Sequence, residues 1–185
     1  MNLELMIIDN FYINPDNVRA FALSQDFNIT GNFPGVRTKP YLPDDVKQAI
    51  QLCVKNLAGN VTNWFDGTEH QGYSGAFQLT TANDRTWIHA DYYSDWAGVC
   101  YLTPNAPTSG GTGLYRHKTT GEYKKVNNDH NGYDYTTWEL VDVVGNKYNR
   151  LVLYRGNSFH ASLDYFGDNA QNGRLFQTFF FNTEN

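Results

Sequence analysis

The spacing of apolar positions changes about one third of the way along the chain. Residues 43–59 repeat apolar side chains at helical intervals and end on Gly59, which is typical of a helix C-cap, so they predict an amphipathic helix. An earlier helix is predicted from Asn14, as N-cap before Pro15, to about Gln25, after an opening strand within residues 3–13. Neither helix carries a pattern that suggests catalysis, so both are expected to support a sheet.

Beyond residue 60 the pattern changes to short apolar segments separated by Gly, Asn and Asp. This is typical of a sandwich or barrel rather than of alternating strands and helices. The predicted strands span residues 75–81, 87–92, 97–102, 113–117, 136–143, 150–154, 158–161 and 174–182. Strands of this length in two sheets form a jelly roll. The sequence therefore predicts a mainly β, cupin-like chain in one domain, with a helical support layer at 1–60 and the β core at 61–185.

Composition and charge narrow the possible partners. Thirteen Tyr, twelve Phe and four Trp favour half-buried positions on a sheet and predict an aromatic-lined cavity. A net charge of −5 provides no basic stripe, so neither nucleic acid nor a membrane is expected as a partner. The chain shows no signal peptide and no apolar run long enough for a membrane span. Cys53 and Cys100 are expected as reduced thiols, which favours a cytoplasmic location.

Three residues form a candidate metal site. His89 and Asp91 are two positions apart on an extended segment, so their side chains are expected on the same face and within reach of one ion. His160 lies in a second apolar, strand-like segment and can complete a set of two histidines and one carboxylate. This set leaves open positions on the metal and is the one used by non-haem Fe(II) oxygenases. His89, Asp91 and His160 are therefore the predicted metal ligands and catalytic residues.

The order of these residues resembles a known enzyme family. The three ligands, the Gly110-Gly111-Thr112 turn and Arg174 at the start of the last predicted strand resemble the Fe(II)/2-oxoglutarate-dependent dioxygenase superfamily, within it the prolyl-4-hydroxylase-like branch. The resemblance implies a double-stranded β-helix that uses Fe(II), 2-oxoglutarate and dioxygen, with positive φ at the paired glycines. Related halogenases replace the carboxylate with a small residue, so the presence of Asp91 favours hydroxylation.

The resemblance also assigns the co-substrate site. Arg174 occupies the position at which this family holds the distal carboxylate of 2-oxoglutarate, and arginine suits that task because its planar fork binds a carboxylate through two hydrogen bonds. The interval between His160 and Arg174 is longer than in many relatives, which we attribute to a loop at 163–172. Thr80 and Tyr101 are predicted to add hydrogen bonds to the co-substrate, although each also fits an ordinary position inside the barrel.

Other polar and aromatic residues are predicted to be structural. Arg37 is expected as an exposed charge in a turn at 32–37, and Trp87 is expected to fill the core rather than to line the pocket. The long segment 118–135, rich in Gly, Asn, Asp and Tyr, is predicted to be a lid or binding element. Three histidines, His70, His117 and His130, are predicted to lie at the surface, although His117 and His130 flank the predicted lid and could contact the substrate.

The function predicted from the sequence is hydroxylation of a peptidyl residue, an amino acid or a small metabolite by an Fe(II)- and 2-oxoglutarate-dependent dioxygenase. One alternative is a cupin-like metalloenzyme that uses the same ligands without the keto acid, but the presence of Arg174 argues against this alternative. The other is a non-enzymatic jelly-roll protein, binding or structural, with a vestigial metal site, because this fold hosts many functions. The expected partner is a small-molecule or peptide substrate, and the oligomeric state is not predicted.

Overall fold

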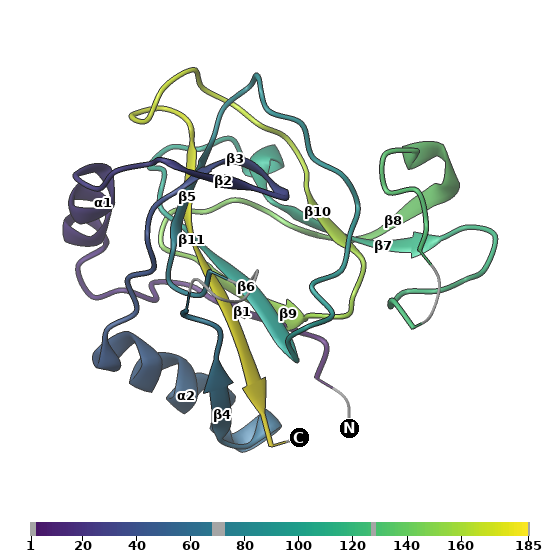
Figure 1. Cartoon of the computed structure of the whole chain (residues 1–185), viewed down its shortest axis with the longest axis horizontal. Helices are drawn as coiled ribbons and strands as arrows, with labels where there is room; N and C mark the ends of the chain where they lie inside the picture. Colours follow the sequence, from purple (N-terminus) through teal and green to yellow (C-terminus); the bar gives the residue numbers. More distant parts are fainter. Residues whose placement is uncertain (1–2, 68–72, 127–128, 185) are drawn as a thin grey trace.

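The computed structural model describes residues 3–67, 73–126 and 129–184 (Figure 1). Its helices α1 (Pro15–Leu23) and α2 (Asp44–Ala58) confirm the two helices predicted from the sequence. Gly59 ends α2 with a φ of 82°, a backbone conformation that favours glycine. The side chain of Asn14 makes no capping hydrogen bond at the start of α1. Across the described residues, neither helix combines the length and the hydropathy needed to cross a bilayer.

A large antiparallel sheet contains eight strands within the described residues. Its order is β1-β9-β6-β11-β5-β3-β2, and β4 also pairs with β11. The bounds are β1 (Leu5–Ile8), β2 (Ile29–Gly31), β3 (Phe33–Arg37), β4 (Val61–Trp64), β5 (Phe77–Thr80), β6 (Trp96–Tyr101), β9 (Leu151–Arg155) and β11 (Arg174–Thr183). The first 60 residues therefore supply three strands of this sheet in addition to the two helices.

A smaller sheet has the order β10-β7-β8. Its strands are β7 (Thr112–His117), β8 (Trp138–Val144) and β10 (His160–Ser162), and the 3-10 turns η1 (Thr108–Gly110) and η2 (Tyr135–Thr137) precede β7 and β8. Two sheets of short strands, with helices from the N-terminal segment, confirm the predicted mainly β jelly-roll architecture.

Two local predictions were wrong. The expected strand at 87–92 is irregular, and only His89 pairs there, through an isolated antiparallel bridge to His160. Its neighbour Ile88 donates its backbone N–H to Gly132 of the 118–135 segment, so this stretch bonds to a loop rather than to a strand. The expected turn at 32–37 is instead the strand β3, because Gly35, at a φ of 70°, fits against the β5 backbone where a Cβ would clash.

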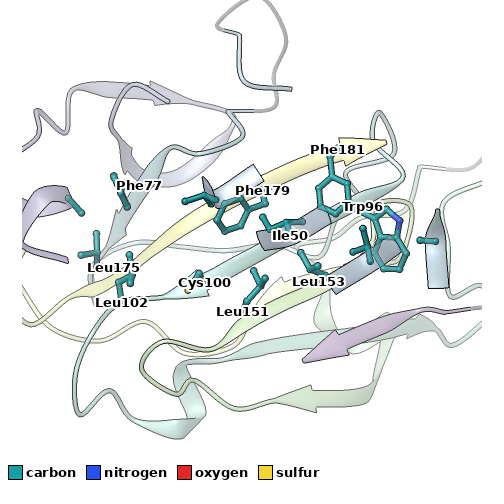
Figure 2. Close-up of a cluster of buried hydrophobic side chains, with 14 of the residues drawn as sticks. Ile50, Phe77, Trp96, Cys100, Leu102, Leu151, Leu153, Leu175, Phe179 and Phe181 are labelled. Atoms are coloured by element: carbon teal, nitrogen blue, oxygen red, sulfur yellow. The ribbon is translucent and has the colours of Figure 1, made fainter. Parts of the chain in front are cut away.

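The strand β11 separates two environments. Side chains on a strand alternate between its faces, and on one face Leu175, Phe179 and Phe181 pack into a core cluster with Ile50 and other apolar residues of α2 (Figure 2). On the other face, the side chains line a cavity: Arg174, Phe176, Thr178 and Phe180. The helices thus support one side of the large sheet, and the opposite side is free to form a binding site.

Candidate metal centre and its cavity

The structure brings together the three residues predicted to bind a metal. The ligand atoms of His89, Asp91 and His160 all lie within 4.8 Å of one another. His160 Nε2 is 3.2 Å from Asp91 Oδ2, and His89 Nε2 is 4.0 Å from Asp91 Oδ1. Cis ligands of an octahedral ion bound at about 2.1 Å lie roughly 3.0 Å apart. The observed spacing therefore fits one ion with only small movements of the side chains.

The backbone fixes the tautomer of both imidazoles. His89 Nδ1 lies 3.0 Å from the carbonyl oxygen of Trp87, and His160 Nδ1 lies 2.9 Å from that of Ser158. A carbonyl can only accept, so each Nδ1 carries the proton and donates it. The lone pair of each Nε2 is left free and directed at the site, an arrangement typical of histidines that bind metals.

The electrostatics of the site also favour a cation. Desolvation inside the cavity lowers the pKa of His89, and the neighbouring His160 lowers it further. Burial on its own would raise the pKa of Asp91, but its close contact with His160 and the electrostatic effects of both histidines and of Arg37 outweigh it, so the pKa lies below its usual value. A neutral imidazole and an ionised carboxylate are the protonation states that bind a metal.

Arg174 lies deep in the same cavity and has one free hydrogen-bonding position. It is 1% exposed, and its guanidinium donates through Nε to the Gly110 carbonyl at 2.8 Å and through Nη2 to the Gly111 carbonyl at 3.3 Å. The ring of Phe176 lies 4.4 Å from the guanidinium carbon. The Nη1 atom is buried without a partner among the described residues. An unpartnered buried donor on a cation fits an anionic ligand group.

The paired glycines have a different role from the one expected. Neither Gly110 nor Gly111 has a positive φ; both are required because of close contacts. A Cβ on Gly111 would clash with the Val144 carbonyl, and one on Gly110 would clash with the Phe166 ring. The glycines let this turn approach its neighbours closely enough for both carbonyls to hold Arg174.

Thr80 and Tyr101 lie behind the cavity wall rather than in it. Neither residue lines the cavity. The Thr80 hydroxyl lies 3.5 Å from the Arg174 carbonyl oxygen, and the Tyr101 hydroxyl shares a 2.7 Å hydrogen bond with Thr112 Oγ1. Thr112 does line the cavity. In this geometry the two residues support Arg174 and Thr112, and their predicted contact with the co-substrate stays a prediction.

The cavity has a volume of about 680 Å³ and is lined by both sheets and by the 118–135 segment. This size lies within the range of about 300–1,000 Å³ common for ligand sites.

Trp87 lines the cavity and contacts the rings of His89 and Tyr133, so its prediction as a core residue was wrong. Arg37 also lines it at 7% exposure, which corrects its prediction as an exposed loop charge.

The burial of Arg37 was not predicted because residues that surround it come from distant parts of the chain. Its Nε donates to Gln78 Oε1 on β5 at 2.8 Å, and its guanidinium carbon lies 3.9 Å from the Phe33 ring. A weak signal is present in the sequence: Phe33 and Arg37 share one face of a segment with period two. The intervening Pro34-Gly35 pair, which is typical of a turn, hides that period.

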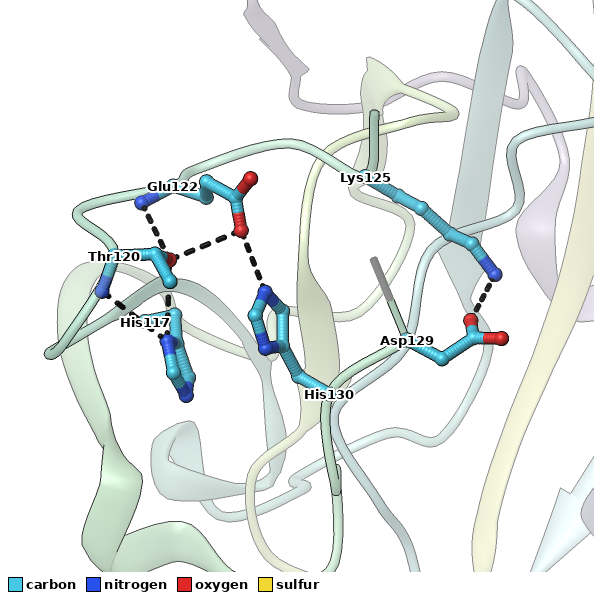
Figure 3. A network of polar contacts seen from close by, with 6 residues as sticks. All are labelled: His117, Thr120, Glu122, Lys125, Asp129 and His130. Atoms are coloured by element: carbon cyan, nitrogen blue, oxygen red, sulfur yellow. Dashed lines mark hydrogen bonds and ion pairs between the residues drawn. The ribbon is translucent and has the colours of Figure 1, made fainter. Parts of the chain in front are cut away.

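The 118–135 segment folds against the cavity and is held by its own polar contacts (Figure 3). His130 Nε2 lies 2.6 Å from Glu122 Oε2, and Thr120 connects Glu122 to His117 through hydrogen bonds of 2.9 and 3.1 Å. His130 stacks on His117 and lines the cavity, so its prediction as a surface residue was wrong. His70 lies outside the described residues.

Comparisons with known proteins were made for both sequence and fold. A family model described as a family of unknown function (DUF6445) matches residues 2–137. No curated protein matches the chain.

Solved structures match over nearly the whole chain. The structure of HygX from Streptomyces hygroscopicus with nickel, 2-oxoglutarate and hygromycin B bound is 12% identical, with a TM-score of 0.61, over 98% of this chain and 83% of HygX. A prolyl hydroxylase from Trichoplax adhaerens, in complex with a hypoxia inducible factor peptide fragment, is 15% identical, with a TM-score of 0.56, over 96% of this chain and 83% of that one.

A prolyl-4-hydroxylase from Pseudomonas putida is 16% identical, with a TM-score of 0.52, over 98% of this chain and 94% of that one. At these identities the similarity shows the fold alone. The chain has the jelly-roll fold of these structures, which confirms the predicted fold class.

Proposed function

The chain belongs to the protein family described as a family of unknown function (DUF6445), and we propose that it is a non-haem Fe(II)- and 2-oxoglutarate-dependent dioxygenase that hydroxylates its substrate. One observation carries the proposal. His89, Asp91 and His160 converge on one point, with both Nε2 lone pairs free, in the cavity that also contains the unpartnered Nη1 of Arg174.

Each of these residues has a defined task. His89, Asp91 and His160 would hold the iron and leave three of six octahedral positions open. Arg174 would bind the distal carboxylate of 2-oxoglutarate through Nη1, while the Gly110 and Gly111 carbonyls keep the guanidinium in position. With dioxygen, the bound iron and 2-oxoglutarate would supply oxidative decarboxylation to succinate and carbon dioxide, coupled to insertion of oxygen into a substrate C–H bond.

The cavity walls favour chemistry that must be shielded from water. Several large aromatic side chains line the cavity together with the candidate ligands, among them Trp87, Tyr93 and Tyr154. Thr178 and Phe180 close the wall on β11. A desolvated site strengthens the interaction of Asp91 and Arg174 with charged ligands and limits side reactions of a reactive oxidant.

The decisive experiment is metal and co-substrate analysis of protein purified without oxygen. We expect one Fe(II) per chain and release of succinate that requires 2-oxoglutarate and oxygen, and His160→Ala should lose both. Iron binding without consumption of 2-oxoglutarate would instead favour a cupin-like metalloenzyme of another kind. Absence of metal binding in the wild-type protein would favour a non-enzymatic jelly-roll protein.

One of the similar structures contains a small-molecule ligand, hygromycin B, and another contains a peptide. Both substrate classes are therefore compatible with the fold, and the choice between them depends on the rest of the cavity.

A further inference from the structure

Arg37 is a second guanidinium in the cavity, and the proposed co-substrate site does not use it. Its Nε is engaged by Gln78, but its two terminal nitrogens make no hydrogen bond with any residue that the structure describes. Within the same residues, no carboxylate forms an ion pair with Arg37. Burial lowers the pKa of Arg37 to about 10, so the group keeps its positive charge at neutral pH. A buried cation without an anionic partner is costly in free energy, which makes a ligand the natural partner.

The two guanidinium groups lie beside different rings of β11 in the cavity. Arg37 pairs in register with Gln78, and Gln78 pairs with Phe176, so all three side chains face the same side of the sheet. The guanidinium of Arg174 contacts the Phe176 ring, whereas that of Arg37 lies 6.0 Å from the ring of Phe180. Phe176 and Phe180 are four residues apart on β11, so their Cα atoms are separated by roughly 13 Å.

Because the two cations lie beside different rings, we assign a separate anionic group to each. Arg174, held by the Gly110 and Gly111 carbonyls, is the better site for the distal carboxylate of the co-substrate, because its free Nη1 is fully buried. Arg37 and the three candidate metal ligands line the same cavity. It is therefore placed to bind a second molecule held beside the metal.

The balance of charges in the cavity also favours an anionic ligand at Arg37. The positive charges of a divalent ion and of Arg174 are cancelled by Asp91 and the two carboxylates of 2-oxoglutarate. Lys125 and Asp129 form an ion pair with each other. Among the described residues that line the cavity, Arg37 then keeps one uncompensated positive charge, and a ligand with a single negative charge would neutralise it.

The walls around Arg37 define the rest of the ligand. The rings of Phe33, Tyr73 and Phe180 all lie within 6.0 Å of its guanidinium carbon. Tyr93 also lines the cavity near this group, and Arg37 influences its pKa. These rings offer apolar surface and few hydrogen-bonding groups, which suits an apolar or aromatic body attached to the anionic group.

We propose that the substrate is a small carboxylic acid with an apolar or aromatic body, and that its carboxylate binds the terminal nitrogens of Arg37. This inference rests on the proposed function, because it treats the metal and Arg174 as already assigned. It makes Arg37 a residue that determines specificity, and it favours a free acid over an internal residue of a peptide.

The test measures binding rather than turnover. Wild-type protein loaded with Ni(II) and 2-oxoglutarate is titrated in a calorimeter with four acids and with their neutral amides: benzoate, phenylacetate, 3-phenylpropanoate and N-acetyl-L-phenylalanine. The same titrations are made with Arg37→Gln and Arg37→Lys. Arg116→Gln is the matched control, because it removes an exposed arginine that also lies beside an aromatic ring. Binding of Ni(II) and of 2-oxoglutarate is measured separately for each variant.

We expect at least one acid to bind the wild-type protein at least ~30-fold more tightly than its amide, the scale of a charge-assisted hydrogen-bonded pair. Arg37→Gln should reduce this preference to less than ~3-fold, Arg37→Lys should restore part of it, and Arg116→Gln should leave it unchanged. The affinities of all variants for Ni(II) and 2-oxoglutarate should stay within about 2-fold of the wild type.

Three outcomes would overturn the inference while leaving the proposed function intact. The first is that none of the four acids binds better than its amide to protein that does bind Ni(II) and 2-oxoglutarate. The second is that Arg37→Gln weakens 2-oxoglutarate as much as Arg174→Gln does. The third is tighter binding of the capped peptide acetyl-Gly-Phe-Gly-amide, which has no free carboxylate, than of every free acid. Failure of the wild-type protein to bind 2-oxoglutarate at all would instead refute the proposed function, and with it the inference.

Discussion

The carboxylate of Asp91 lies 3.2 Å from the Nε2 atom of His160, although the two residues belong to distant parts of the chain. The backbone bridge between His89 and His160 produces this contact, with hydrogen bonds of 3.0 and 2.8 Å in the two directions. One bridge thus brings the local His89-Asp91 pair to the third candidate ligand. The two imidazole rings lie 4.4 Å apart, close enough to share one ion.

Replacement of either histidine by alanine should remove metal binding. We expect His89→Ala and His160→Ala to bind Fe(II) or Ni(II) at least ~100-fold more weakly than the wild type, because each loses one of three protein ligands. The measurement is metal content after dialysis, together with calorimetric titration. His117→Ala is the matched control, since His117 does not line the cavity, and it should keep full affinity. Full metal occupancy in either ligand variant would contradict the assignment.

Replacement of Arg174 by glutamine should separate metal binding from co-substrate binding. We expect unchanged Ni(II) affinity and at least ~100-fold weaker binding of 2-oxoglutarate, from loss of a buried charge-assisted contact. Arg19→Gln is a matched control, because Arg19 also donates to two carbonyl oxygens, those of Leu102 and Gln171, but lies outside the cavity. If both variants weakened 2-oxoglutarate equally, the effect would be one of stability and not of the site.

The turn that holds Arg174 should tolerate no side chain at Gly111. A Cβ there would clash with the Val144 backbone, so Gly111→Ala should destabilise the fold by at least ~2 kcal/mol and weaken 2-oxoglutarate binding. Gly121→Ala is the comparison: it meets no neighbouring atom but has a φ of 74°, and should cost only about 1 kcal/mol. Urea unfolding curves measure both, and equal losses would show that the close contact is unimportant.

Alanine substitutions on α2 should destabilise the protein only on the face of the helix that packs into the core. Ile50 is fully buried against the sheet, whereas Leu52 on the same helix is 66% exposed. We expect Ile50→Ala to lower the free energy of unfolding by about 2–5 kcal/mol and Leu52→Ala to change it by less than about 0.5 kcal/mol. Chemical denaturation measures the free energy of unfolding of both variants. Similar losses in both variants would mean that the helix packs through a different face.

Asp9 should make stability depend on acid pH. Its hydrogen bonds with Arg150 and Lys147 hold the pKa of this carboxyl well below its usual value. A carboxyl whose pKa is lower in the folded state adds stability above its unfolded pKa of about 3.9, and this stability is lost as the pH falls through the folded value. Asp9→Asn should therefore lower stability at pH 7 and have less effect in strong acid. Urea midpoints measured from pH 7 down to pH 2 would test this, and an equal effect at every pH would contradict it.

The features of this protein that could be predicted from its sequence depend on local periodicity. The His89-Asp91 spacing, the helical repeat of α2 and the alternation along β11 are each set by neighbours in the chain, and the structure has them as predicted. Because alternation also holds in an extended segment that is not part of a sheet, the pair faces one site even though the expected strand there was wrong.

The features that could not be predicted depend on partners far away in sequence. Arg37 is buried because Gln78 and aromatic rings from other strands surround it, and the turn-like Pro34-Gly35 pair hides the weak local pattern that indicates this. The paired glycines keep ordinary backbone angles and are required by the position of Val144. In both cases the tertiary contact, and not the backbone preference of the residue, decides its role.

The hydrogen bond from Ile88 to the Gly132 carbonyl joins the segment that carries two candidate ligands to the segment that covers the cavity. A Cβ on Gly132 would clash with the Ile88 backbone, so the two chains run in direct contact. Substitutions at residues 129–133 that are selected for a new substrate would therefore also shift the backbone of His89. In this protein, changes at residues 129–133 that reshape the cavity also act on the backbone that carries two candidate metal ligands, which limits the routes by which its substrate range can evolve.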